Sequence, residues 1–161
     1  MKIGRGLLYG LLGAGAISIL STLLRGLGLP IQIELLLGTL FGAQAGPLAF
    51  VLGLGIHLTI GALFGVLYAW LFETVWNHGG ASTGMILAVL HASLFGMFIG
   101  LTPQFHPLIP EQMANPGAFY ANLGVGGVVA FFALHIIYGA LVGAGYGHVA
   151  AEKEWAPAGR L

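Results

Sequence analysis

The chain has 161 residues, of which only 6% are charged and 58% are hydrophobic, and its formal net charge is zero. Ordinary soluble domains carry about 25% charged residues, so this composition excludes an ordinary soluble protein. The zero net charge provides no basic surface for nucleic acid. The sequence contains no cysteine, which excludes disulfides, thiolate metal sites and cysteine nucleophiles.

Four long stretches of the chain contain no charged residue. They hold 19, 38, 37 and 40 residues and are bounded by Arg5, Arg25, Glu34, Glu73, Glu111 and Glu152. A helix that crosses a bilayer needs about 20 apolar residues. We therefore expect an all-α membrane protein that forms one integral membrane domain over residues 1–161.

The first predicted helix covers residues 7–24 and ends in the segment 25–30, which contains two glycines and a proline. The next charge-free stretch, residues 35–72, is too long for one span. As a single helix it would measure about 57 Å, whereas the hydrocarbon core is about 30 Å thick. Pro47 follows a glycine and supplies a natural break.

We therefore expect a short segment at residues 33–45 that lies at the interface or is half-buried, followed by a second spanning helix at 47–72. The alternative is a tight turn at 44–47 between two short spans, which is disfavoured because 13 residues cannot cross the bilayer. Residues 77–80 read Asn-His-Gly-Gly, a turn signal. The third spanning helix is expected to follow at 81–101.

A proline-rich loop at residues 102–116 ends the third helix. The fourth helix is expected to occupy much of residues 117–148. The remaining residues, 150–161, form a short polar tail in which Trp155 would anchor at the membrane interface.

One stretch of the chain occurs twice, at residues 57–69 and 135–147. At an offset of 78 the two copies agree at six positions: His57/His135, Gly61/Gly139, Ala62/Ala140, Leu63/Leu141, Gly65/Gly143 and Tyr68/Tyr146. The spacings of the His, Gly, Gly and Tyr residues are close to whole helical turns, so these side chains share one helix face.

The repeat extends beyond this motif, because Glu34 and Glu111 are related by a similar offset of 77. We place repeat 1 at about 5–73 and repeat 2 at about 81–149. Each repeat contains two spanning helices, so both run in the same direction across the membrane. The expected fold is four transmembrane helices arranged as two parallel-repeat helical hairpins.

The positive charges predict the orientation in the membrane. Four of the five, Lys2, Arg5, Lys153 and Arg160, lie near the termini, and an even number of spans places both termini on one side. The positive-inside rule then makes both termini cytoplasmic. Arg25 would lie outside.

Histidines near the middle of predicted spans are the first candidates for a functional site. Imidazole is a normal axial ligand of haem iron, so His57 and His135 could hold a haem b between neighbouring helices. Gly61 and Gly139, one turn away on the same face, would leave room for the flat macrocycle. A Zn or Cu site formed by His57, His91 and His135 is the second cofactor hypothesis.

The alternative interpretation of the same motif is structural. Gly61 and Gly65, and Gly139 and Gly143, form GxxxG patterns that let helix backbones approach closely. The midplane histidines would then make hydrogen bonds to facing helices. Tyr68 and Tyr146 would complete these helix-packing faces and anchor their cytoplasmic ends.

The remaining ionisable residues suggest simpler roles. We expect His78, His106 and His148 to be solvated. Glu34 and Glu111, in the two outer loops, would either cap helices or form a pair that attracts cations.

No nucleophile–base–orienter set and no carboxylate within a span is visible, so we expect no enzyme. Parallel repeats do occur in transporters, which leaves a dimeric small-solute or ion carrier as a further alternative. Such a carrier would need a second copy, because four helices rarely enclose a path alone.

A resemblance adds to this interpretation. The Gly-Leu-Pro loop at residues 28–30 and the pattern His-x3-Gly-x3-Gly-x2-Tyr, beginning at His57 and at His135, resemble a family of uncharacterised bacterial four-helix inner-membrane proteins. The likeness covers most of residues 5–148. It implies a multi-pass protein of the bacterial inner (cytoplasmic) membrane, and it does not imply any particular activity.

From these observations we expect a small, non-enzymatic accessory or scaffold subunit. Its glycine faces would contact a second copy of the chain, giving a homo-oligomer, or a larger membrane complex. The lipid bilayer is the other expected partner. A haem b- or metal-binding bundle and the dimeric carrier remain alternatives.

Overall fold

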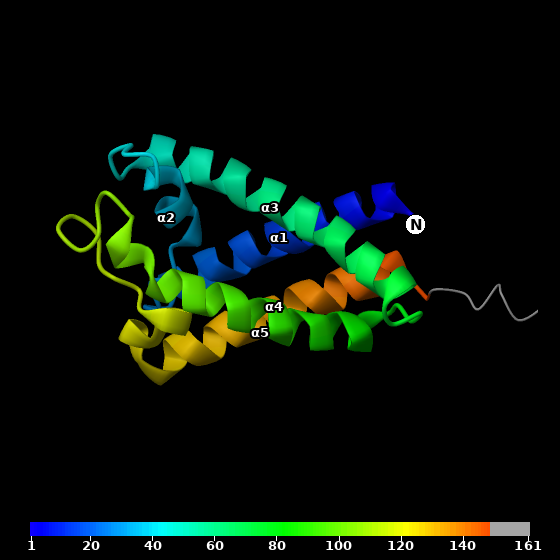
Figure 1. The fold of residues 1–161 in the computed structure, drawn as a ribbon. Coiled ribbons are helices and arrows are strands. Elements are labelled where there is room, and N and C mark those ends of the chain that lie inside the picture. The colour runs from blue at the N-terminus through cyan, green and yellow to red at the C-terminus, as the bar shows by residue number, and fades with distance from the viewer. Residues whose placement is uncertain (149–161) are drawn as a thin grey trace, which may run out of the picture.

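The computed structural model describes residues 1–148; the predicted tail at 150–161 and Trp155 lie outside the described residues. Within residues 1–148 the chain is helical and contains no strand (Figure 1). The helices are α1 (Ile3–Gly26), α2 (Ile33–Thr39), α3 (Pro47–Thr74), α4 (Ala81–Gly100), the 3-10 helices η1 (Thr102–Gln104) and η2 (Ala118–Leu123), and α5 (Gly124–Tyr146).

Four helical stretches are long and apolar enough to cross a membrane: Ile3–Gly26, Pro47–Thr74, Ala81–Gln104 and Ala118–Tyr146. The predicted all-α membrane fold with four spanning helices is therefore confirmed. Helix α3 begins at Pro47, as predicted, because proline at the first helical position lacks only an N–H that has no partner there.

The segment at 33–45 does not span. Its helix α2 has seven residues and is therefore only about 10 Å long. It folds back onto α3, and the contact is close because both sides carry glycine: a Cβ at Gly38 or at Gly53 would collide with backbone atoms of the facing helix.

The last spanning helix differs from its predicted form. Residues Ala118–Leu123 form a 3-10 segment in which Phe119 and Tyr120 have φ values of 56° and 60°, and the regular helix α5 begins only at Gly124. The left-handed backbone at two successive residues prevents a continuous helix from residue 117 onward.

Two antiparallel hairpins make up the bundle. Helix α1 lies against α3, where a Cβ on Gly6 would approach the Gly65 carbonyl oxygen to 2.8 Å and one on Gly10 would approach the Gly65 Cα to 2.9 Å. Helix α4 lies against α5, where a Cβ on Gly84 would approach the Gly143 Cα to 3.1 Å. Only glycine permits backbones to come so close.

Helices α1 and α5 join the two hairpins. A Cβ at Gly13 would lie 2.8 Å from the Tyr138 ring, and one at Gly145 would collide with the Tyr9 ring. These contacts make α1 antiparallel to α5, so the two hairpins run in the same direction. The backbone N–H of Lys2 donates to the Tyr146 hydroxyl (3.0 Å), which brings the start of α1 and the end of α5 together.

Helices α3 and α4 are joined by the turn after Thr74 and then separate. Figure 1 shows them diverging toward the end of the bundle where α2 lies. The bundle is therefore closed on the α1–α5 side and spread open on the α3–α4 side. This asymmetry positions the cavity described next.

Candidate ligand-binding cavity

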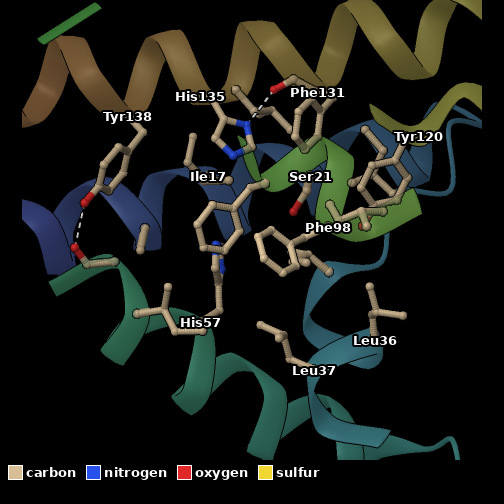
Figure 2. Close-up of a pocket in the computed structure, with 18 of the residues that line it drawn as sticks. Ile17, Ser21, Leu36, Leu37, His57, Phe98, Tyr120, Phe131, His135 and Tyr138 are labelled. Carbon is tan, nitrogen blue, oxygen red and sulfur yellow. Dashed lines mark hydrogen bonds between the residues drawn. The ribbon is translucent and has the colours of Figure 1, made fainter. Parts of the chain in front are cut away.

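A cavity of about 230 Å³ lies inside the spread half of the bundle. Helices α1, α2, α3, α4 and α5 and the loops beside them all contribute to its wall, which consists mainly of aliphatic and aromatic side chains. Figure 2 shows His57 extending from α3 and His135 from α5 on opposite sides of this space. Phe98 and Phe105 also line it and are 62% and 56% exposed, so the wall continues to the molecular surface on the α4 side.

His91 lies between α3 and α4 and keeps the two helices apart beside the cavity. Its ring stacks on Phe64 of α3, with centroids 4.1 Å apart and an interplanar angle of 2°. Its Nδ1 lies 3.3 Å from the Tyr68 hydroxyl, also on α3. The two helices therefore contact each other through large side chains here, rather than through glycines.

His57 and His135 each bind the protein through one ring nitrogen. The Nδ1 of His57 lies 2.9 Å from the Ser18 Oγ on α1. The Nδ1 of His135 lies 2.8 Å from the carbonyl oxygen of Phe131, one turn earlier on α5. Neither Nε2 atom has a hydrogen-bond partner among residues 1–148.

The structure brings together the histidines of both cofactor hypotheses. His57, His91 and His135 all line the cavity, and the rings of His91 and His135 meet edge to face with centroids 5.2 Å apart. Across residues 1–148, however, no three His, Cys, Asp or Glu side chains form a group that could hold a metal ion.

The glycines of the haem hypothesis are packed against neighbouring helices, although Gly61 also borders the cavity. A Cβ on Gly61 would collide with the Ala14 side chain, and one on Gly139 would lie 2.6 Å from the Ala88 Cβ. Both positions are filled by a neighbouring helix. The space directly beside the two Cα atoms, where the sequence predicted room for a macrocycle, is therefore taken by Ala14 and Ala88.

The four glycines of the GxxxG patterns lie inside the bundle. Gly61 and Gly65 contact α1, and Gly139 and Gly143 contact α4 and the residues before it. All four are buried. The faces predicted to contact a second copy are therefore occupied within this chain.

The two tyrosines of the motif are also buried, each 2% exposed. Tyr146 donates a hydrogen bond to the Glu73 carboxylate near the end of α3, so it ties two helix ends together. The sequence suggested that Tyr68 anchors at the membrane interface. Its hydroxyl instead points inward to His91.

Two polar contacts near the α2 end of the bundle were missed. His106, expected to be solvated, is 4% exposed, and its Nε2 lies 3.0 Å from the Leu36 carbonyl oxygen and 3.2 Å from the Thr39 Oγ1. No sequence signal indicated these contacts, because the partners lie about 70 positions away in the chain.

Glu34 is fully buried, and its Oε2 lies 3.0 Å from the Arg25 Nη1 in an ion pair. Ser21 donates to the other carboxylate oxygen at 3.3 Å. Glu111, its predicted partner in a cation-attracting pair, is exposed. The Glu34 carboxylate is therefore neutralised by Arg25 and is not available to an external cation.

Tyr120 completes the end of the cavity that lies away from Tyr138 (Figure 2). Its side chain is 4% exposed, and its hydroxyl has no hydrogen-bond partner among residues 1–148. Tyr138, by contrast, donates to the Gly61 carbonyl oxygen at 2.6 Å. The sequence drew no attention to either tyrosine.

Comparison with protein-family models, with curated proteins and with solved structures finds no match.

Proposed function

We propose that this chain is a non-enzymatic, membrane-embedded binding protein that takes a small lipophilic molecule from the bilayer into the cavity between α3 and α4. The observation that carries this proposal is the apolar cavity itself, which has a few polar groups placed among aromatic and aliphatic walls. Such a combination is typical of sites that bind small molecules.

The access route supports the same conclusion. Phe98 and Phe105 line the cavity and are also more than half exposed. Because α4 is one of the four helices suited to cross the membrane, an apolar molecule in the bilayer would meet apolar side chains along the whole path. A water-soluble ion would meet few polar groups there, which disfavours the carrier alternative.

Haem b remains a second candidate on one observation. His57 and His135 each use Nδ1 for a protein contact, and their Nε2 atoms have no hydrogen-bond partner within residues 1–148. Ligating histidines are usually held in this way. An absorption spectrum of the purified protein tests it. A Soret band together with an α-band that sharpens on reduction, both of them lost in His57→Phe, would favour haem, and a colourless protein would exclude it.

The scaffold role stays a prediction, but the glycine faces expected to contact a second copy or a larger complex no longer support it. Gly61, Gly65, Gly139 and Gly143 contact other helices of this chain, so a homo-oligomer or a larger complex would have to use other surfaces.

We also propose that the protein lies in the bacterial inner membrane with both termini on the cytoplasmic side, and that its two hairpins form an internal repeat. The repeat is supported by the glycine contacts of the two hairpins, which recur at an offset of 78: Gly6 with Gly65, and Gly84 with Gly143.

Photolabelling in the membrane tests the binding function. The protein would be reconstituted in lipid nanodiscs and irradiated with a diazirine-bearing alkylbenzene, and the labelled residues would be mapped by mass spectrometry. We expect labelling of the cavity wall that saturates and is displaced by excess unlabelled alkylbenzene. Labelling of the lipid-facing surface should instead rise in proportion to probe concentration.

A matched pair of variants on α3 provides the control. Ile60 lines the cavity, whereas Leu63 does not line it and is 61% exposed. Ile60→Trp fills cavity space and should abolish the saturable labelling, while Leu63→Trp should leave it unchanged. Cavity labelling that never saturates in the unmodified protein would refute the proposed function.

A further inference from the structure

His135 presents a fixed hydrogen-bond acceptor to the cavity. Its Nδ1 lies 2.8 Å from the Phe131 carbonyl oxygen, and a carbonyl oxygen can only accept. Nδ1 must therefore carry the proton, and a neutral imidazole then has an unprotonated Nε2. This Nε2 has no partner among residues 1–148, so the acceptor is free to receive a donor from a ligand.

Tyr120 presents a hydroxyl group at the other end of the same wall. Its side chain is almost fully buried, yet its Oη has no hydrogen-bond partner in the described part of the chain. Leaving such a group unpaired in an apolar environment is unfavourable. A bound molecule with an acceptor oxygen at this position would remove that cost.

The backbone that places Tyr120 is itself strained. Phe119 and Tyr120 adopt left-handed φ values of 56° and 60°, respectively, a conformation that is unfavourable for residues other than glycine. Strain of this kind persists where the surrounding structure requires it, and it is concentrated at ligand sites. Here it places Tyr120 in the wall at this end of the cavity.

One aromatic ring separates the two polar groups. The Phe131 ring lies 4.3 Å from the His135 ring and 6.0 Å from the Tyr120 ring, measured between centroids. Figure 2 shows His135, Phe131 and Tyr120 in this order along the cavity. The Phe131 ring thus lies between the His135 and Tyr120 rings and also lines the cavity, where an aromatic ligand can pack against it.

Building on the proposed function, we propose that the ligand is an aromatic lipid with a phenolic hydroxyl, of the kind represented by a membrane quinol. Its O–H donates to the His135 Nε2, and a second oxygen across the ring accepts from the Tyr120 hydroxyl. Its apolar tail leaves past Phe98 and Phe105 into the bilayer.

Three competitors that differ only in their oxygens test this assignment. Decyl-benzoquinol offers donors and acceptors, decyl-benzoquinone offers acceptors only, and the dimethyl ether of the quinol also lacks a donor. Each would be used to displace the alkylbenzene photolabel from the cavity. We expect the quinol to compete about five- to tenfold more strongly than the quinone or the ether, as one hydrogen bond of about 1 kcal/mol or slightly more implies.

Two variants separate the two contacts. His135→Phe keeps a ring but removes the acceptor, so it should abolish the preference for quinol over ether. Tyr120→Phe removes only the unpaired hydroxyl, so it should weaken quinol, quinone and ether alike, by about fivefold, and leave the preference intact. Neither variant should change the folded state, which circular dichroism and thermal unfolding would check.

The outcomes distinguish this inference from the function on which it rests. Saturable alkylbenzene labelling with equal competition by all three compounds would refute the phenolic ligand and leave the lipophile-binding function standing. Failure of all three compounds to compete would likewise refute the phenolic ligand and leave the lipophile-binding function standing. A preference for quinol that survives in His135→Phe would refute the role of His135, and absence of saturable labelling would remove the function and the inference together.

Discussion

The hydroxyl of Tyr138 on α5 donates a 2.6 Å hydrogen bond to the carbonyl oxygen of Gly61 on α3, and so joins the two hairpins across the middle of the bundle. To reach α3, the Tyr138 ring passes over Gly13 of α1, where a Cβ would lie 2.8 Å from its Cδ2 atom. The bond therefore depends on a glycine in a third helix.

We predict that Gly13→Ala destabilises the protein by about 1–3 kcal/mol, because the new methyl group collides with the Tyr138 ring. Tyr138→Leu should lose the hydrogen bond, worth about 1 kcal/mol, but should make room at Gly13. In that background Gly13→Ala should be nearly neutral. Unfolding in increasing SDS fractions measures all four proteins.

Gly15→Ala is the control for this cycle. Gly15 lies on the same helix, and a Cβ there would meet only the Leu58 side chain at 3.9 Å, which is an ordinary contact. It should leave stability unchanged or slightly raised, since alanine favours helix. Equal effects of Gly13→Ala in both backgrounds would contradict the proposed dependence on Tyr138.

The glycine faces make a second prediction, which concerns folding within one chain. A Cβ at Gly65 would approach the Gly10 Cα to 2.7 Å, whereas a Cβ at Gly55, on the same helix, has open space around it. Gly65→Leu should cost about 3 kcal/mol or more by forcing α1 and α3 apart. Gly55→Leu should be neutral in thermal unfolding.

Mass measurement in detergent separates this prediction from the scaffold hypothesis. Gly65→Leu should lower the unfolding temperature without converting a larger assembly into a smaller one. If Gly65→Leu instead left the unfolding temperature unchanged and reduced the mass of an oligomer, the glycine would contact another copy, contrary to the contacts within this chain.

Much of the fold could be predicted because its signals are local. Charge-free length predicts the four spans, and Pro47 and the Gly-rich turn at 77–80 mark helix ends. The fourth helix occupies much of residues 117–148, as expected, but its start at Gly124 could not be predicted, because the left-handed backbone at Phe119 and Tyr120 has no local sequence signal. These residues are not glycine, asparagine or aspartate, which tolerate that conformation best.

The candidate site was predicted only in part. His57, His91 and His135 were singled out from the sequence and line the cavity, whereas His106, which also lines it, was expected to be solvated. The cavity itself depends on differences between positions related by the offset of 78. Gly13 lets α1 approach α5, whereas the position 78 residues later is His91, which separates α4 from α3. The positions that are identical in the two repeats predicted the close helix contacts. The open α3–α4 side arises from positions that differ between the repeats.

The ion pair between the buried Glu34 and the partly exposed Arg25 leads to a third prediction. Removing one partner leaves a charge in an apolar environment, which costs about 3–5 kcal/mol, whereas removing both can be close to neutral. We expect Arg25→Met and Glu34→Leu each to destabilise the protein strongly and the double variant to be more stable than either. A double-mutant cycle by SDS unfolding measures the coupling, and strictly additive losses would contradict a direct pair.

The orientation proposed for the membrane can be tested because the chain contains no cysteine, so a single introduced thiol is the only one. His78, in the turn between α3 and α4, and Gln104, the last residue of η1, are both exposed and lie beyond opposite ends of α4. In intact bacterial cells a membrane-impermeant maleimide should label Gln104→Cys, and should label His78→Cys only after lysis. The reverse pattern would invert the orientation while leaving the bundle intact. Labelling of both from outside would contradict a membrane-spanning α4, because residues at its two ends would then share one side.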